Sequence, residues 1–169
     1  MNLQKLFLTF FGSGLSPVAP GTVGTAAAIP FGLAIMYYFG VNSLTTVVIV
    51  FSIIAIFEIN KYEKQGGVHD DKSIVIDEAV GVWLTMAITY GGLSLWQDPY
   101  NQYLALLLSF LTFRLFDIWK PSTIGYIDRK VKGGAGVVLD DLLAGFAAGV
   151  LNLLIFRALA YFNISSVNL

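Results

Sequence analysis

Five long apolar stretches dominate this chain and leave few ways in which it can fold. They lie at residues 22–40, 44–59, 79–96, 103–119 and 139–162. Apolar stretches of about 17 to 25 residues are long enough to cross a bilayer as helices. A helix satisfies its own backbone hydrogen bonds in lipid, and the alternating pattern of a membrane barrel is not visible here. The sequence therefore predicts an all-α polytopic membrane protein, a bundle of about five transmembrane helices.

The composition supports a single membrane-embedded domain over residues 1–169. Apolar residues make up 56% of the chain and charged residues only 12%, against about a quarter charged in soluble domains. Cysteine is absent, which excludes disulfides and thiolate metal sites. A net charge of −1 argues against nucleic acid as a partner. We expect the first ten or so residues to add a short interfacial helix, and Pro30 to kink the first span.

The charged side chains predict which face of the membrane each connection occupies. Apart from Lys5, Asp98 and Arg157, all of them lie in residues 58–78 or 114–141. Five alternating spans place the N-terminus and both charged segments on one face, together with nearly all the lysines and arginines. The positive-inside rule makes that face cytoplasmic and puts the C-terminus outside.

Five acidic residues lie where the predicted third, fourth and fifth spans meet this face. They are Asp77, Glu78, Asp117, Asp140 and Asp141. Carboxylates at a membrane edge are costly and repel one another, and a divalent cation relieves that repulsion. A set of oxygen ligands without thiolates favours Mg²⁺. Helix capping is the competing interpretation for the two adjacent pairs, and an ion pair with Arg114 or Lys120 is the competing interpretation for Asp117.

Two loops on the same face offer groups that suit an anion. Residues 12–25, "GSGLSPVAPGTVGT", include Ser13 and Gly14 and lack the lysine of a P-loop. Such a loop either presents backbone N–H groups to an anion or merely leads into the membrane, and both readings stay open. Arg129, together with Arg114 and Lys120, is a candidate to hold a phosphate.

His69 is the only histidine of the chain and stands next to Asp70. A histidine beside a carboxylate can relay a proton at neutral pH, but a lone histidine is as readily structural. Further along, Gly145 and Gly149 form a GxxxG spacing, which predicts close packing of the last span inside the bundle.

Taken together, the motifs resemble those of the phosphatidylglycerophosphatase A family of bacterial inner-membrane lipid phosphatases. The matching segments are "GSGLSPVAPGTVGT", "HD…SIV…DE…GVW", "FRLFDIWKP" and "DR…GGAGVVLDDLLAG", in order over most of residues 12 to 145. The resemblance implies Mg²⁺-dependent removal of the terminal phosphate from phosphatidylglycerophosphate at the cytoplasmic leaflet, which yields phosphatidylglycerol. It implicates His69, Asp70, Asp77, Glu78, Arg114, Asp117, Lys120, Asp128, Arg129, Asp140 and Asp141.

We assign roles to these residues as a hypothesis. The five membrane-edge acids would bind the metal, and Arg114, Lys120 and Arg129, with Ser13 and Gly14 of the first loop, would bind the substrate. His69, Asp70 and Asp128 form the catalytic group, in which His69 moves the proton. Water attack and a direct attack by an aspartate both remain open.

Two other classes of protein compete with the phosphatase. A divalent-cation transporter would place its acids near the middle of the bilayer and often has repeated halves. A non-catalytic protein that binds anionic lipids would need the basic segment but not the acids.

Overall fold

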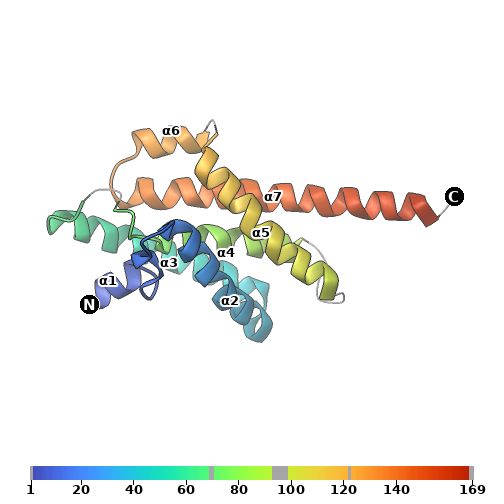
Figure 1. Ribbon diagram of the computed structural model, residues 1–169, viewed down its shortest axis with the longest axis horizontal. Helices are drawn as coiled ribbons and strands as arrows, with labels where there is room; N and C mark the ends of the chain where they lie inside the picture. Colours follow the sequence, from blue (N-terminus) through green and yellow to red (C-terminus); the bar gives the residue numbers. More distant parts are fainter. Residues whose placement is uncertain (1, 69–70, 93–98, 122, 168–169) are drawn as a thin grey trace.

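The computed structural model describes residues 2–68, 71–92, 99–121 and 123–167 (Figure 1). The side chains of residues 99, 128 and 162–167 lie outside this description.

Helices make up all the regular structure of the described residues. In chain order they are α1 (Leu3–Leu8), the short 3₁₀ helix η1 (Ser13–Leu15), α2 (Pro20–Phe39), α3 (Val41–Lys64), α4 (Ile76–Gly91), α5 (Pro99–Trp119), α6 (Thr123–Lys130) and α7 (Gly134–Val167). The all-helical membrane class is confirmed, and a short N-terminal helix is present as α1. The helix α6, between the fourth and fifth predicted spans, was not predicted. Pro30 lies inside α2, which continues beyond it.

Among the described residues, four helices are long and apolar enough to cross a membrane: α2, α3, α5 and α7. The predicted third span is shorter than expected, since α4 has 16 residues and rises only about 24 Å, less than the roughly 30 Å of a hydrocarbon core. Its side chains are nearly all buried, because α2, α3, α5 and α7 all pack against it. The helix α4 is therefore the centre of the bundle.

The two ends of the bundle differ in what they carry. Figure 1 shows the N-terminus, the C-terminal end of α3 and α6 toward one end of the molecule, and the C-terminus of the chain at the other. The first turn of α4 points toward the end that holds α6, where the acidic residues of the sequence gather. This arrangement agrees with the alternating path predicted from the charges.

Glycine contacts bring α4 and α7 close together. A Cβ atom at Gly145 would collide with the carbonyl of Gly81, and one at Gly149 would lie 2.7 Å from Ile88 Cβ. The hydroxyl of Thr85 donates a hydrogen bond of 3.1 Å to the Gly145 carbonyl across the same contact. The close packing predicted from the GxxxG spacing is confirmed, and it sets the distance between the two helices that carry the acids.

A buried asparagine connects three helices deeper in the bundle. Asn152 of α7 is fully buried. Its Nδ2 donates to Thr89 Oγ1 of α4 at 3.0 Å, and its Oδ1 accepts from Thr112 Oγ1 of α5 at 3.1 Å. Interhelical hydrogen bonds of this kind hold membrane helices together where lipid provides no competing partner.

We expect Asn152→Leu to lower the stability of the bundle by about 1–2 kcal/mol, because both interhelical hydrogen bonds are lost. The measurement is thermal unfolding of the purified protein in detergent micelles. Asn42→Leu is the matched control, since Asn42 is exposed at the start of α3 and should unfold like the wild type. An Asn152 variant as stable as that control would show that the network contributes nothing.

Candidate metal and phosphate site

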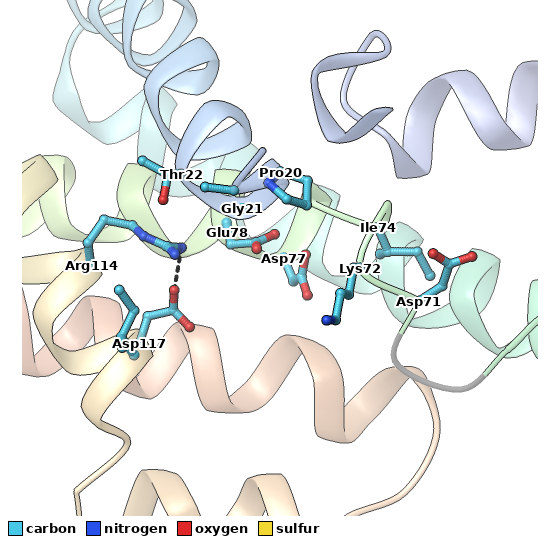
Figure 2. A pocket seen from close by; sticks show the side chains of 12 residues that line it. Pro20, Gly21, Thr22, Asp71, Lys72, Ile74, Asp77, Glu78, Arg114 and Asp117 are labelled. Carbon is cyan, nitrogen blue, oxygen red and sulfur yellow. Dashed lines mark hydrogen bonds and ion pairs between the residues drawn. The ribbon is translucent and has the colours of Figure 1, made fainter. Parts of the chain in front are cut away.

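A cavity of about 300 Å³ opens where α2 begins and α5 ends (Figure 2). It is lined by Ala19, Pro20, Gly21, Thr22, Asp71, Lys72, Ile74, Asp77, Glu78, Arg114, Asp117 and Ile118. Four of these residues are acidic and two are basic. The cavity therefore combines an excess of negative charge with cations suited to an anion.

Three carboxylates from two helices converge beside this cavity. Asp77 and Glu78 come from the first turn of α4, and Asp141 comes from α7. Each offers an oxygen, and the three oxygens lie within 4.8 Å of one another. Asp77 and Asp141 are buried, with 8% and 4% of their surface exposed. Ionised carboxylates in so small a space repel one another, and a cation close by would relieve that repulsion.

Helix capping does not account for this cluster. Asp141 lies roughly two turns inside α7, which begins at Gly134 and not at the aspartates as expected. Asp77 and Glu78 do lie in the first turn of α4, where the helix dipole favours acids. Even so, Asp77 Oδ1 and Glu78 Oε2 are buried without a hydrogen-bond partner among the described residues. Buried carboxylate oxygens that converge and lack donors fit a hard divalent cation such as Mg²⁺.

Arg114 and Asp117 add an ion pair at the edge of the cluster. The Nη1 atom of Arg114 contacts Asp117 Oδ2 one helical turn further along α5 (Figure 2). The ion pair proposed as an alternative for Asp117 is therefore present. Asp117 is also close enough to Asp141 for the two carboxyl groups to interact. Asp117 thus lies between the arginine and the three-carboxylate cluster.

The N-terminus of α2 forms one wall of the cavity. Ala19 precedes the helix in a left-handed conformation (φ 47°), and Pro20 occupies the first turn. The first N–H groups of a helix have no partner within it and favour an anion. At Gly21 a Cβ atom would collide with Glu78 Oε1 and lie 3.2 Å from Arg114 Nη1. Glycine at this position lets the helix backbone approach the acid and the arginine directly.

The structure places Ser13 and Gly14 away from this wall. The Ser13 hydroxyl donates to the Phe10 carbonyl at 2.9 Å, and Gly14 packs against the backbone of Ser73. Neither residue lines the cavity, and substrate binding by these two residues stays a prediction from the sequence. The loop "GSGLSPVAPGTVGT" reaches the site through its last part, Ala19 to Thr22. Gly14, in its first part, instead allows close approach to the segment before α4.

Lys120 and Asp140 pair with each other beside the cluster. The Lys120 ammonium lies 2.6 Å from Asp140 Oδ2. Lys120 has a positive φ of 45° directly after α5, a conformation that costs a non-glycine residue energy. Neither residue lines the cavity, and Arg129 is exposed on α6. These three residues therefore surround the candidate site without facing the cavity.

The proposed catalytic group cannot be placed. His69 and Asp70 lie outside the described residues, and so does the side chain of Asp128 on α6. Their roles stay predictions from the sequence.

Eight residues that line the cavity were not among the candidates from the sequence, and they include Gly21, Thr22, Asp71 and Lys72. Asp71 accepts a hydrogen bond of 2.7 Å from the Tyr62 hydroxyl and one of 2.9 Å from the Ser73 amide. These bonds lower the pKa of Asp71, so it is ionised at neutral pH and fastens the segment that leads into α4. The only sequence signal for Lys72 is its place next to the His–Asp motif.

The comparison with protein families shows to which family the chain belongs. The family model described as phosphatidylglycerophosphatase A matches residues 6–156. The chain belongs to the phosphatidylglycerophosphatase A family. Membership confirms the family that the motifs indicated, and with it the expectation of a phosphatase.

Three relatives support this assignment. Phosphatidylglycerophosphatase A of Escherichia coli (strain K12) is 39% identical over 151 residues, which cover 89% of this chain and 82% of the relative. The Haemophilus influenzae protein of the same name is 34% identical over 148 residues, 88% of this chain and 85% of the relative. A Bacteroides thetaiotaomicron protein, provisionally named a phosphatidylinositol-3-phosphatase, is 35% identical over 153 residues, 88% of this chain and 91% of the relative. No solved structure matches this chain.

We expect Gly21→Ala to lower kcat/KM for phosphate release by roughly 10- to 100-fold, because the added methyl group displaces Glu78 or Arg114. A shift of about 1 Å in an active site has an effect of this order. Gly91→Ala is the matched control, since a Cβ there would meet only Val41 Cγ1, at an ordinary 3.5 Å. Steady-state kinetics of both purified variants make the comparison. A Gly21 variant as active as the Gly91 variant would show that this close approach is not needed.

Proposed function

We propose that this protein is a Mg²⁺-dependent phosphatase that hydrolyses phosphatidylglycerophosphate to phosphatidylglycerol and inorganic phosphate at the cytoplasmic leaflet of the bacterial inner membrane. The observation that carries the proposal is the three-carboxylate cluster of Asp77, Glu78 and Asp141 beside a cavity that also holds Arg114 and a helix N-terminus. The family membership supports the reaction class, and the names of two relatives support the substrate.

Asp77, Glu78 and Asp141 are the residues that would hold the metal, with Asp117 next to them as a further oxygen donor. When bound there, Mg²⁺ supplies positive charge to the phosphate oxygens and orients the attacking water. Asp140 does not belong to this set in our proposal. It holds Lys120 at the edge of the site, and the pair positions the end of α5 relative to α7.

Arg114 is the residue best placed to bind the terminal phosphate. Its guanidinium lies at the cavity wall beside the N-terminus of α2, so one phosphate reaches both the side chain and the free backbone N–H groups. Asp117 orients the guanidinium through the ion pair. Lys72, on the opposite part of the lining, adds a second positive charge (Figure 2).

The hydrolysis needs a proton acceptor and a proton donor. An oxygen of water bonds to phosphorus, the bond from phosphorus to the glycerol oxygen breaks, and that oxygen takes up a proton as the alcohol of phosphatidylglycerol. His69, supported by Asp70, is our candidate to move this proton, on the sequence argument alone. The placement of the acids toward one end of the bundle disfavours the cation-transporter alternative, which requires them near the middle of the bilayer.

The first test is phosphate release by the purified protein from phosphatidylglycerophosphate in mixed micelles. We expect activity with Mg²⁺, none in EDTA, and losses in Asp77→Asn and Asp141→Asn that exceed the roughly 10- to 100-fold typical of changes beside a metal ligand. Glu58→Gln is the control carboxylate, because Glu58 of α3 pairs with Lys61 away from the cavity. Phosphatidylinositol 3-phosphate, assayed in parallel, tests the substrate class named for the Bacteroides relative.

A direct measurement of Mg²⁺ binding shows whether a variant loses activity because it no longer binds the metal or because only the chemical step is impaired. Titration calorimetry with Mg²⁺ should show binding to the wild type and to Glu58→Gln but none to Asp141→Asn. Full phosphatase activity in EDTA, or unchanged Mg²⁺ binding by the Asp141 variant, would rule out the proposed metal site.

The second test concerns the orientation in the membrane. A periplasm-active reporter fused after Leu169 should be active, and the same reporter inserted after Gly66, between α3 and α4, should be silent. The reason is that the two termini lie at opposite ends of the bundle, and the lysines gather at the N-terminal end (Figure 1). A silent C-terminal fusion would contradict the proposed orientation.

A further inference from the structure

A second cavity lies between the same two helices that border the candidate site. It has a volume of about 340 Å³ and is lined by Pro30, Leu33, Ala34, Tyr37 and Tyr38 of α2 and by Gln102, Tyr103 and Leu106 of α5. The candidate site occupies the beginning of α2 and the end of α5, whereas this cavity occupies the end of α2 and the beginning of α5. The two helices run antiparallel and lie side by side in Figure 1. Both cavities therefore lie along the line where α2 faces α5, which we call the crevice between α2 and α5.

The face of α2 along this crevice is built from small side chains. Thr22 lines the first cavity, Pro30 and Ala34 line the second, and Ala26 lies between them at the same spacing of four residues. Residues four apart share one face of a helix. Ala26, Pro30 and Ala34 are all exposed.

The length of α2 shows how far the crevice reaches from the candidate site. With a rise of about 1.5 Å per residue, Pro30 lies about 14 Å and Ala34 about 20 Å along the helix from Gly21. One leaflet contributes about half of the roughly 30 Å hydrocarbon core. A lipid whose phosphate reaches Gly21 would therefore bring the end of its acyl chain to the second cavity.

Tyrosines mark the far limit of the second cavity. Tyr37, Tyr38 and Tyr103 are all more than two-thirds exposed. Exposed tyrosines are typical of the membrane–water interface, where the ring is in lipid and the hydroxyl is in water. The apolar part of the cavity, at Pro30, Leu33 and Leu106, faces the side of the candidate site. The crevice is thus apolar over the depth at which an acyl chain would lie.

We propose that the crevice between α2 and α5 binds an acyl chain of the lipid whose phosphate headgroup occupies the candidate site. This inference rests on the proposed lipid phosphatase function and adds a second binding region to it. The chain enters sideways from the bilayer, because the row Ala26, Pro30 and Ala34 along α2 is exposed and consists of small residues. The crevice aligns the lipid so that its terminal phosphate meets Arg114 and the start of α2, and it makes activity depend on chain length.

The test is Ala34→Trp, which fills the second cavity. Side chains on a helix lean toward its N-terminus, so the indole covers the space near Pro30 and Leu33. Ala158→Trp is the matched control, since Ala158 is exposed on α7 away from both cavities. Phosphate release is measured with dipalmitoyl phosphatidylglycerophosphate and with the dihexanoyl lipid, whose chains end before Pro30.

We expect Ala34→Trp to lower kcat/KM for the dipalmitoyl lipid about tenfold, which is the size of loss seen when a pocket rejects part of an apolar group. For the dihexanoyl lipid, kcat/KM should stay within about twofold of the wild-type value. Ala158→Trp should change neither. Equal turnover of the dipalmitoyl lipid by Ala34→Trp and wild type, or an equal loss for both lipids, would overturn the proposal. Failure of the wild type to hydrolyse either lipid would instead overturn the proposed function.

A second measurement tests the crevice without turnover. Dipalmitoyl-length phosphatidylglycerophosphate with a diazirine at the end of one chain is photolysed with the Asp141→Asn protein, and the adducts are mapped by mass spectrometry. Adducts at Leu33, Ala34 or Leu106 support the crevice as the chain site. Adducts confined to the outer faces of α3 and α7 would overturn it.

Discussion

The constraint on which the site depends is the cost of holding several carboxylates together at the end of a membrane bundle. Asp77, Glu78 and Asp141 converge within 4.8 Å, and two of their buried oxygens lack donors among the described residues. The positive end of the α4 dipole and the guanidinium of Arg114 offset part of this repulsion. The remaining excess of negative charge is the basis for the proposed metal site, because a bound cation would offset it and would in turn attract a phosphate.

The short helix α4 makes the position of the acids depend on the packing of the whole bundle. It carries two of the three acids, and its buried position means that every neighbouring helix fixes its place. The close contact between Gly81 and Gly145 sets the separation of α4 and α7, and thus the distance from Asp77 to Asp141. Asn152 holds the same helices together deeper in the bundle. The geometry of the acids is therefore a consequence of helix packing.

Local sequence patterns predicted much of this structure and failed where the patterns were ambiguous. The apolar runs at 22–40 and 103–119 correspond closely to α2 and α5, because long uncharged stretches have few alternatives in lipid. The start of α7 was missed because its first residues, "GAG", are poor helix formers, and tertiary packing extends the helix over them. The same error made capping a reasonable interpretation of Asp140 and Asp141, which in fact lie well inside the helix.

The sequence by itself determined the helical membrane class, the gathering of charge at one end and the family, since each depends on composition or on ordered motifs. Only the tertiary structure decided which acids converge: it grouped Asp141 with Asp77 and Glu78, and paired its neighbour Asp140 with Lys120. It also placed Gly21 and Thr22, and not Ser13 and Gly14, at the cavity wall, while substrate binding by Ser13 and Gly14 stays a prediction. The physical reason is that adjacent residues on a helix point in different directions, so their partners depend on how the helices pack against one another.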